Sequence, residues 1–183
     1  MQERPQAFLG STFGSNSAMF YRQATLALED GTRLRGVSFG YEESISGELV
    51  FTTGMVGYPE SLTDPSYRGQ LLCCTYPLIG NYGVPRDERD DLGLPVHFES
   101  DAIHVSALLV SEYSHEPCHW NASKTLGEWL AENDSPGLYG IDTRQLTKHI
   151  RERGAMLGRI MPAGVSDSDV KQWDPNQTNL VAQ

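Results

Sequence analysis

The sequence predicts an α+β fold, because segments with strand character come first and segments with helix character come last. Short apolar runs bounded by turn residues recur between residues 25 and 111, and each has the length of a strand. Apolar residues at helical spacing first appear in residues 123–133 and then in 142–153. A chain that groups its strands before its helices favours a layered β/β/α domain over a doubly wound sheet.

Length and composition are those of one globular domain. The chain has 183 residues, of which 39% are hydrophobic, enough to form a core. Its 14 Lys and Arg residues face 24 Asp and Glu residues, and the net charge of -10 argues against a surface for nucleic acid or an anionic membrane. No stretch approaches the roughly 20 apolar residues of a membrane helix. Three cysteines without a CxxC pair fit a reduced, intracellular protein.

The two ends of the chain differ from its middle. Residues 1–23 are rich in Ser, Gly and Gln without periodicity, so we expect a disordered leader. A mitochondrial transit peptide is the alternative, because Arg4 and Arg22 are basic and acidic residues are few, although Glu3 weakens this signal. Residues 24–161 form the predicted domain, and residues 162–183 are polar and irregular.

The first half of the domain reads as strands. Residues 25–28 and 32–37 flank Asp30-Gly31, a strong hairpin signal because Gly tolerates a positive φ. Residues 49–51 and 71–74 suit buried strands. The polar segment between them is dense in Gly and Pro, so we expect turns there rather than a helix.

The second half predicts two more strands and two helices before a final strand. Residues 103–111 become a continuous apolar run, typical of a strand buried on both faces. The helix over 123–133 has Asn121 or Ser123 as its cap, and the helix after Asp142 has Gln145 in the capping-box position. The remaining elements are short strands at 138–141 and 157–161, with Gly154 placed to end the second helix.

Residues of catalytic type are scattered, and we assign none of them a catalytic role. The GxGxxG, P-loop and GxSxG patterns are absent. Cys118 lies between His115 and His119, which fits part of a zinc site, but a fourth ligand at suitable spacing is missing and Pro117 favours a plain turn. The mixed charges of residues 86–91 favour a solvated loop over a calcium loop. The sequence therefore predicts no metal site.

The segment Thr63-Asp64-Pro65-Ser66-Tyr67 is the strongest binding candidate. Asp64-Pro65 begins a rigid turn that projects Ser66, whose hydroxyl can donate to and accept from a small polar ligand. From these residues alone, an ordinary turn in which Ser66 bonds its own backbone is favoured over a ligand role.

Longer segments carry a family resemblance. The stretches GELVFTTGMVGYPESLTDPSYRGQ, TYPLIGNYG, FESDAIHVSALLVSEYS, GLYGIDTRQLTKHIRERGAMLGRI and DPNQTNLVAQ occur in this order. Together they closely resemble the N-terminal domain of the small, glutamine-handling subunit of carbamoyl-phosphate synthetase. They resemble equally the matching domain of the fused pyrimidine-pathway polypeptides. The resemblance covers about residues 24–183.

The resemblance reverses the interpretation of the loop. It implies that Ser66 contacts glutamine and that Met55 and Asp64 lie near the start of an ammonia path. It also implies backbone-geometry roles for Gly54, Gly57 and Gly80. In the family, the catalytic Cys and His belong to a C-terminal glutaminase domain absent from this chain, so residues 162–183 are expected to be a linker toward it.

The resemblance also names the expected partners. They are the glutaminase domain of the same parent polypeptide, the large synthetase subunit or domain, and glutamine, with no nucleic acid and no membrane. This domain needs no cofactor, whereas ATP and magnesium are expected on the synthetase, which makes carbamoyl phosphate for pyrimidine or arginine synthesis. The expected compartment is the cytoplasm, or alternatively the mitochondrial matrix. Two rival functions are an interaction scaffold without ligand contact and a metal or thiol enzyme centred on Cys118 and His119.

Overall fold

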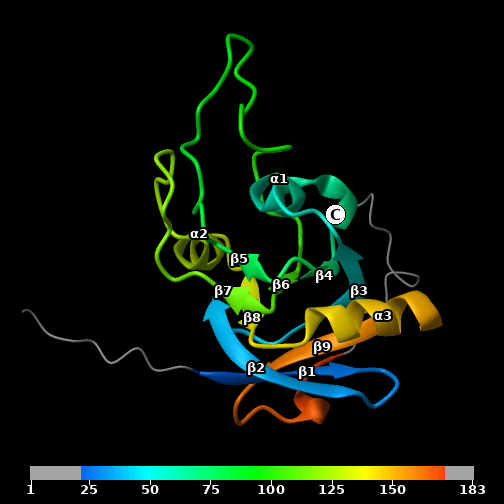
Figure 1. The fold of residues 1–183 in the computed structure, drawn as a ribbon. Coiled ribbons are helices and arrows are strands. Elements are labelled where there is room, and N and C mark those ends of the chain that lie inside the picture. The colour runs from blue at the N-terminus through cyan, green and yellow to red at the C-terminus, as the bar shows by residue number, and fades with distance from the viewer. Residues whose placement is uncertain (1–21, 172–183) are drawn as a thin grey trace, which may run out of the picture.

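The computed structural model describes residues 22–171. Figure 1 shows the strands and helices of this range, coloured from the N-terminal to the C-terminal end of the chain. The strands are β1 Gln23–Leu28, β2 Arg33–Gly40, β3 Ile45–Thr52, β4 Gln70–Cys74, β5 Leu78–Ile79, β6 Ala107–Leu109, β7 Glu112–Tyr113, β8 Pro136–Tyr139 and β9 Met156–Pro162. The helices are α1 Tyr58–Thr63, α2 Leu126–Glu132 and α3 Thr143–Arg153, with 3-10 helices at Pro65–Tyr67 and Asp167–Asp169.

Seven strands close into a barrel in the order β1-β2-β8-β6-β4-β3-β9. The pairs β3-β4, β4-β6 and β6-β8 are parallel, and the other pairs are antiparallel. The α+β prediction is confirmed, but the layered β/β/α arrangement is not. Because β9 pairs with β1 on one side and with β3 on the other, the sheet closes on itself. Hydrophobic alternation within a strand does not reveal which strands are neighbours.

The predicted hairpin is confirmed at β1 and β2. The two strands pair in antiparallel register from Gln23↔Val37 to Ala27↔Arg33. Gly31 has φ +89°, the conformation that the Asp-Gly pair predicted. The hairpin supplies Leu26 and Leu28 to the barrel interior.

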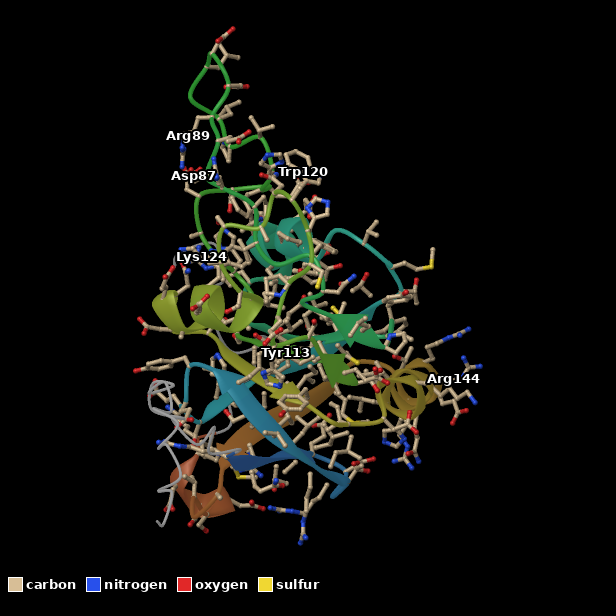
Figure 2. All side chains as sticks on the ribbon, turned by 60° about the vertical axis from the view of Figure 1, so that its left-hand side comes forward. Asp87, Arg89, Tyr113, Trp120, Lys124 and Arg144 are labelled. Carbon is tan, nitrogen blue, oxygen red and sulfur yellow. The ribbon has the colours of Figure 1, made fainter. Side chains whose placement is uncertain are left out.

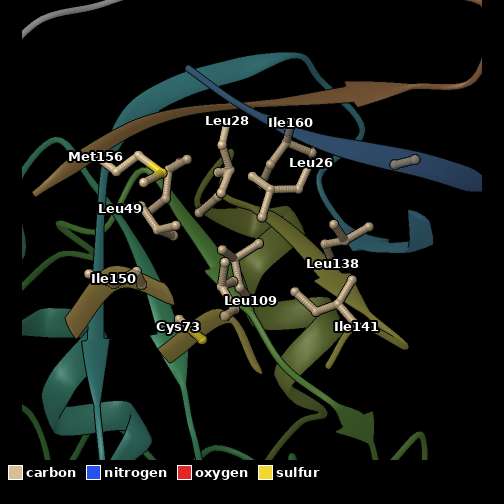
Figure 3. Packing of buried hydrophobic residues seen from close by; sticks show 14 residues of the cluster. Leu26, Leu28, Leu49, Cys73, Leu109, Leu138, Ile141, Ile150, Met156 and Ile160 are labelled. Carbon is tan, nitrogen blue, oxygen red and sulfur yellow. The ribbon is translucent and has the colours of Figure 1, made fainter. Parts of the chain in front are cut away.

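Two hydrophobic clusters lie on opposite faces of β4 and β6. Leu71 and Cys73 point into the barrel, where they pack with buried residues of β1, β3, β6, β8, β9 and α3 (Figure 3). Leu72 and Cys74 point outward into a second cluster covered by α1 and α2. Strands buried on both faces read as continuous apolar runs, which explains the sequence of residues 71–74.

Helix α3 closes one end of the barrel. Its buried residues Leu146 and Ile150 belong to the barrel cluster. The Asp142 side chain accepts a hydrogen bond from the Gln145 amide at 2.8 Å, and the Gly154 amide donates to the Ile150 carbonyl at 2.8 Å. The predicted start and end of this helix are therefore both confirmed.

Helix α2 is confirmed, but its predicted cap is wrong. Thr125, rather than Asn121 or Ser123, is the N-cap, and it forms a complete capping box with Glu128. The physical reason is spacing, because only Thr125 has a Glu three residues later. Leu126 and Leu130, on the inner face of this helix, are fully buried.

The predicted strand over 103–111 is shorter in the structure. Only residues 107–109 form β6, because the preceding backbone bonds elsewhere. The His104 amide donates to the Leu62 carbonyl of α1 at 2.9 Å, and the Ser106 amide donates to the Gln70 carbonyl at 2.8 Å. The start of strand β8 also differs from the prediction, because this strand begins two residues earlier, at Pro136.

The expected leader and linker lie largely outside the described residues, which exclude 1–21 and 172–183. These boundaries therefore stay predictions. Beyond β9, Asp167 pairs with Arg33 at 2.7 Å and its carbonyl accepts from Arg159 at 3.0 Å. Residues 167–170 thus lie against the barrel. No helix within residues 22–171 is long and apolar enough to cross a membrane.

Candidate functional site

The candidate site lies on the crossover from β3 to the parallel strand β4. The expectation of turns alone is wrong here, because Tyr58–Thr63 forms helix α1. Pro59 occupies the first turn, where a missing amide costs nothing, and Tyr58 and Leu62 are buried one turn apart. These two signals were available in the sequence, but the high Gly and Pro content concealed them.

The hydroxyl of Tyr82 caps the N-terminus of α1. The N-cap residue is Gly57, with φ +84°, and a glycine has no side chain to accept from the first amides. Tyr82 Oη accepts from the Gly57 amide at 2.8 Å and from the Tyr58 amide at 3.1 Å. The rings of Tyr58 and Tyr82 stack at 4.1 Å, and Tyr58 Oη donates to the Gly83 carbonyl at 2.6 Å. Burial raises the pKa of both tyrosines, so both stay neutral.

The C-terminal end of α1 is fixed by the segment before β6. Thr63 is buried, and its hydroxyl donates to the Pro59 carbonyl at 2.9 Å while accepting from the Glu99 amide at 3.0 Å. Ser100 Oγ donates to the Thr63 carbonyl at 2.6 Å. Two stretches distant in the sequence, residues 82–83 and 99–100, therefore hold the two ends of α1.

Ser66 is exposed just beyond this anchored end. It lies in the 3-10 helix Pro65–Tyr67, whose N-cap is Asp64. Asp64 Oδ1 accepts from the Ser66 amide at 2.8 Å, and this hydrogen bond lowers the pKa of Asp64. The carboxylate of Asp64 thus holds the backbone that presents Ser66.

Met55 lies at the other end of α1. It follows β3 and is 67% exposed, next to Val56 at 79%. A helix of six residues, as α1 is, is about 9 Å long, so α1 separates Met55 from Ser66. The shallow pocket beside Met55 is lined also by Tyr58, Cys74 and Ile79, and Ser66 is not among its lining residues.

The three glycines with predicted backbone-geometry roles differ in their φ angles. Gly57 and Gly80 have φ +84° and +91°, so both hold conformations that favour glycine. Gly54 does not have a positive φ, and its amide bonds Thr52 Oγ1 at 3.3 Å. The predicted backbone-geometry role of Gly54 therefore does not depend on a left-handed conformation and stays a prediction.

The three cysteines differ in burial. Cys73 and Cys74 are buried, and burial raises the pKa of each thiol to about 12. Cys118 is exposed, and its thiol faces the Glu116 carbonyl at 3.9 Å. Within residues 22–171 no group of three or more His, Cys, Asp or Glu side chains is arranged to hold a metal ion. The zinc alternative at Cys118 and His119 has no support in this part of the chain.

The charged run 86–91 lies in a segment that rises away from the barrel (Figure 1). Its Arg89 bonds Asp101 at 2.7 Å and Asp87 at 3.1 Å, so the charges pair within the loop. Leu92 at the tip is 83% exposed. The interpretation as a solvated loop agrees with this geometry.

Comparison with known proteins matches most of the chain to one family. Residues 26–160 match the model of the family described as carbamoyl-phosphate synthase small chain, CPSase domain. The chain is 53% identical over 164 residues to multifunctional protein pyr1-3 of Dictyostelium discoideum, covering 88% of this chain and 7% of that protein. It is 52% identical over 179 residues to multifunctional protein URA2 of Saccharomyces cerevisiae, covering 88% of this chain and 8% of that protein.

A third relative has a different name. The chain is 52% identical over 163 residues to the mouse protein named carbamoyl-phosphate synthase [ammonia], mitochondrial, covering 88% of this chain and 11% of that protein. The chain therefore spans about a tenth or less of the length of these relatives.

Proposed function

Because the chain belongs to the carbamoyl-phosphate synthase small chain family through its CPSase domain, we propose that it is the accessory N-terminal domain of a glutamine-hydrolysing carbamoyl-phosphate synthase. In this role it completes the glutamine site, helps to seal the start of the ammonia path and docks on the synthetase. The complete enzyme makes carbamoyl phosphate from glutamine, bicarbonate and ATP for pyrimidine or arginine biosynthesis.

The observation that carries this proposal is the presentation of Ser66. Its side chain is exposed on a short 3-10 helix whose backbone is held by Asp64 and whose preceding helix is fixed at both ends. Catalytic and binding loops work when a rigid scaffold holds them in this way. A serine hydroxyl here can bond the polar groups of glutamine when an adjoining domain covers the loop.

The hydrolytic chemistry belongs elsewhere in the parent enzyme. A thiol nucleophile needs a lowered pKa and an adjacent base, whereas burial raises the pKa of Cys73 and Cys74. The proposal therefore assigns the nucleophile to the glutaminase domain, and ATP and magnesium to the synthetase. This chain contributes a wall of the site rather than a reacting group.

The proposed ammonia path begins beside this crossover. Ammonia must be kept from solvent, because protonation would remove its nucleophilicity. Met55 is apolar and exposed, as expected of a residue that a neighbouring domain covers. Asp64 acts in this proposal through the backbone that it holds, since its carboxylate accepts from the Ser66 amide.

The test replaces Ser66 by Ala in the complete enzyme. Carbamoyl-phosphate synthesis is measured with glutamine and, separately, with ammonium as nitrogen source. The proposal expects a higher KM or lower kcat/KM for glutamine with ammonium use intact. Ser168→Ala is a matched control, because Ser168 is also an exposed serine in a 3-10 helix. Equal loss with both nitrogen sources would make the loop a structural element, and no change would overturn the role of Ser66.

The second candidate is an interaction scaffold without ligand contact. It is favoured by the 52% identity to a mouse protein that is named for ammonia rather than glutamine. A complete enzyme that responds to ammonium but not to glutamine would support this candidate. That relative is also named as mitochondrial, so the matrix remains the alternative to the cytoplasm that we propose.

A further inference from the structure

A cavity of about 160 Å³ lies between α2 and the segment that rises away from the barrel after β5. Residues 84–103 of this segment form one side of the cavity, and residues 123–133 form the other. Thr63 and Ser100 line it as well, and the Ser100 hydroxyl donates to the Thr63 carbonyl at 2.6 Å, the bond that fixes the C-terminal end of α1. Ser66 is not among the lining residues, so the proposed glutamine contact gives this cavity no role.

Apolar side chains make up the inner part of the lining. They belong to or pack against the hydrophobic cluster covered by α1 and α2, and they are Val84, Phe98, Ile103 and Trp129. The ring centroids of Phe98 and Trp129 lie 5.4 Å apart, and the two ring planes form an angle of 32°. An apolar cavity of about 150 Å³ holds a benzene molecule. This cavity therefore has room for an apolar side chain of the size of Leu or Phe.

Charged side chains of both signs border the same cavity. Asp87, Arg89 and Asp101 line it, and Figure 2 shows Asp87 and Arg89 next to each other on the rising segment. Arg89 Nη1 donates to Asp101 Oδ1 at 2.7 Å and to the Gly93 carbonyl at 3.2 Å. Arg89 Nη2 donates to Asp87 Oδ2 at 3.1 Å. One guanidinium thus lies between two carboxylates at the edge of an apolar cavity.

These groups keep hydrogen-bonding capacity for a ligand. A guanidinium has five N–H donors, and Arg89 donates three hydrogen bonds within residues 22–171. In the same part of the chain, Asp87 Oδ1 and Asp101 Oδ2 accept no hydrogen bond. The unused N–H groups can hold a carboxylate, and the unused oxygens can hold an ammonium group.

We propose that this cavity binds a free α-amino acid with an apolar side chain, such as leucine. The carboxylate of the ligand bonds Arg89, and its ammonium group bonds Asp87 and Asp101. The side chain of the ligand packs against Phe98 and Trp129. This inference goes beyond the proposed function, because it concerns a second ligand and requires neither glutamine nor catalysis.

The charge of the lining supports a zwitterion. The cavity is lined by two acidic and two basic residues, whose formal charges cancel: Asp87, Asp101, Arg89 and Lys124. A lone anion would face the two carboxylates, and a lone cation would face the two basic side chains, and like charges placed together cost free energy. An α-amino acid avoids both penalties, because it carries its two opposite charges on neighbouring groups.

The test is isothermal titration calorimetry of the full chain with L-leucine. Two analogues keep the hydrocarbon part of leucine: isocaproate lacks the ammonium group, and isoamylamine lacks the carboxylate. We expect L-leucine to bind and each analogue to bind about tenfold more weakly, because each loses a charge-assisted hydrogen bond. Equal binding of L-leucine and isocaproate would overturn the proposal, since the ammonium contact would then not exist.

Asp101→Asn tests the ammonium contact from the side of the protein. The amide oxygen of Asn can still accept from Arg89, so the segment keeps this hydrogen bond while the negative charge is removed. We expect the variant to bind L-leucine about tenfold more weakly than wild type. Asp91→Asn is the matched control, because Asp91 is exposed in the same segment and does not line the cavity. Equal binding of L-leucine by the two variants would contradict the proposal.

A second variant blocks the cavity without removing a charge. Ala102 lines the cavity and is exposed, so Ala102→Trp places an indole at its edge and leaves the barrel core unchanged. We expect this variant to lose L-leucine binding while its urea midpoint stays that of wild type. If Asp101→Asn lowers the urea midpoint, the result with Ala102→Trp decides alone. Unchanged binding in Ala102→Trp would place the ligand elsewhere on the chain and overturn the proposal.

Two further outcomes would overturn the proposal. One is the absence of binding with both L-leucine and L-phenylalanine at millimolar concentration. The other is loss of L-leucine binding in Ser66→Ala but not in Asp101→Asn, which would assign the ligand to the loop of Ser66. Because calorimetry is read without catalysis, failure of the amino-acid site leaves the glutamine contact in place, and failure of the glutamine contact leaves the amino-acid site in place.

Discussion

Tyr82 Oη lies 2.8 Å from the amide of Gly57 and supplies the N-cap that this glycine cannot provide. The two residues belong to different recognisable segments, GMVGYPE and LIGNYG, which the crossover brings together. The glycine adopts the turn conformation, and the tyrosine hydroxyl accepts hydrogen bonds from the amides at the start of the helix. The position of the loop that carries Ser66 thus depends on a residue outside the loop.

Tyr82→Phe tests this cap. The stack on Tyr58 remains, but two helix amides lose their acceptor, so we expect a loss of about 1–2 kcal/mol in the free energy of unfolding. Urea denaturation of the purified chain measures this change. Tyr76→Phe is the control, because Tyr76 is 37% exposed and should unfold as wild type. Equal stability of the two variants would contradict the capping role.

Acid should weaken the contact between the β1–β2 turn and α3. The pKa of Asp30 is lowered to about 2 from its ordinary value of 3.8, first by hydrogen bonding to the amide and side chain of Thr32 and then by His149. A carboxyl whose pKa is lower in the folded state stabilises the fold above its unfolded pKa, and this contribution is lost as pH falls through the folded value.

The measurement is the urea midpoint of wild type and Asp30→Asn from pH 6 to pH 2. The two proteins should differ most at the upper end and converge as the pH approaches about 2, the pKa of Asp30. A difference that stays constant across this range would show that the charge of Asp30 contributes nothing.

Thiol reactivity should separate the three cysteines. The pKa of Cys73 and Cys74 is raised to about 12 by burial, so their thiolate is scarce at pH 8. Cys118 is exposed. We expect iodoacetamide to modify Cys118 in the native chain and the other two only after unfolding, as peptide mass spectrometry would show. Rapid native modification of Cys73 would contradict the buried barrel face.

The sequence predicted the local elements better than their assembly. Asp-Gly at residues 30 and 31 identified the first hairpin, and Asp142 identified the start of α3, because both signals act within a few residues. Barrel closure was not predictable in this way. It depends on β9 pairing with β1 and β3, strands more than a hundred positions earlier along the chain.

In the candidate site, too, the local features were predictable from the sequence and the contacts between distant residues were not. The turn at Asp64 was predicted and is present as an N-cap, and the exposure of Ser66 follows from it. The role of Tyr82 was not predictable, because a distant side chain replaces a local cap. The ligand role of Ser66 came from family resemblance and stays a prediction.

The closing strand has a consequence for biosynthesis. Because β9 is the last strand of the barrel within residues 22–171 and the partner of both β1 and β3, these two strands keep unpaired edges until residues 156–162 have left the ribosome. Unpaired strand edges promote aggregation, because they can pair with strands of other chains. A nascent chain that stalls before this point would therefore expose the unpaired edges of β1 and β3. We expect such a chain to bind chaperones most strongly just before β9 emerges.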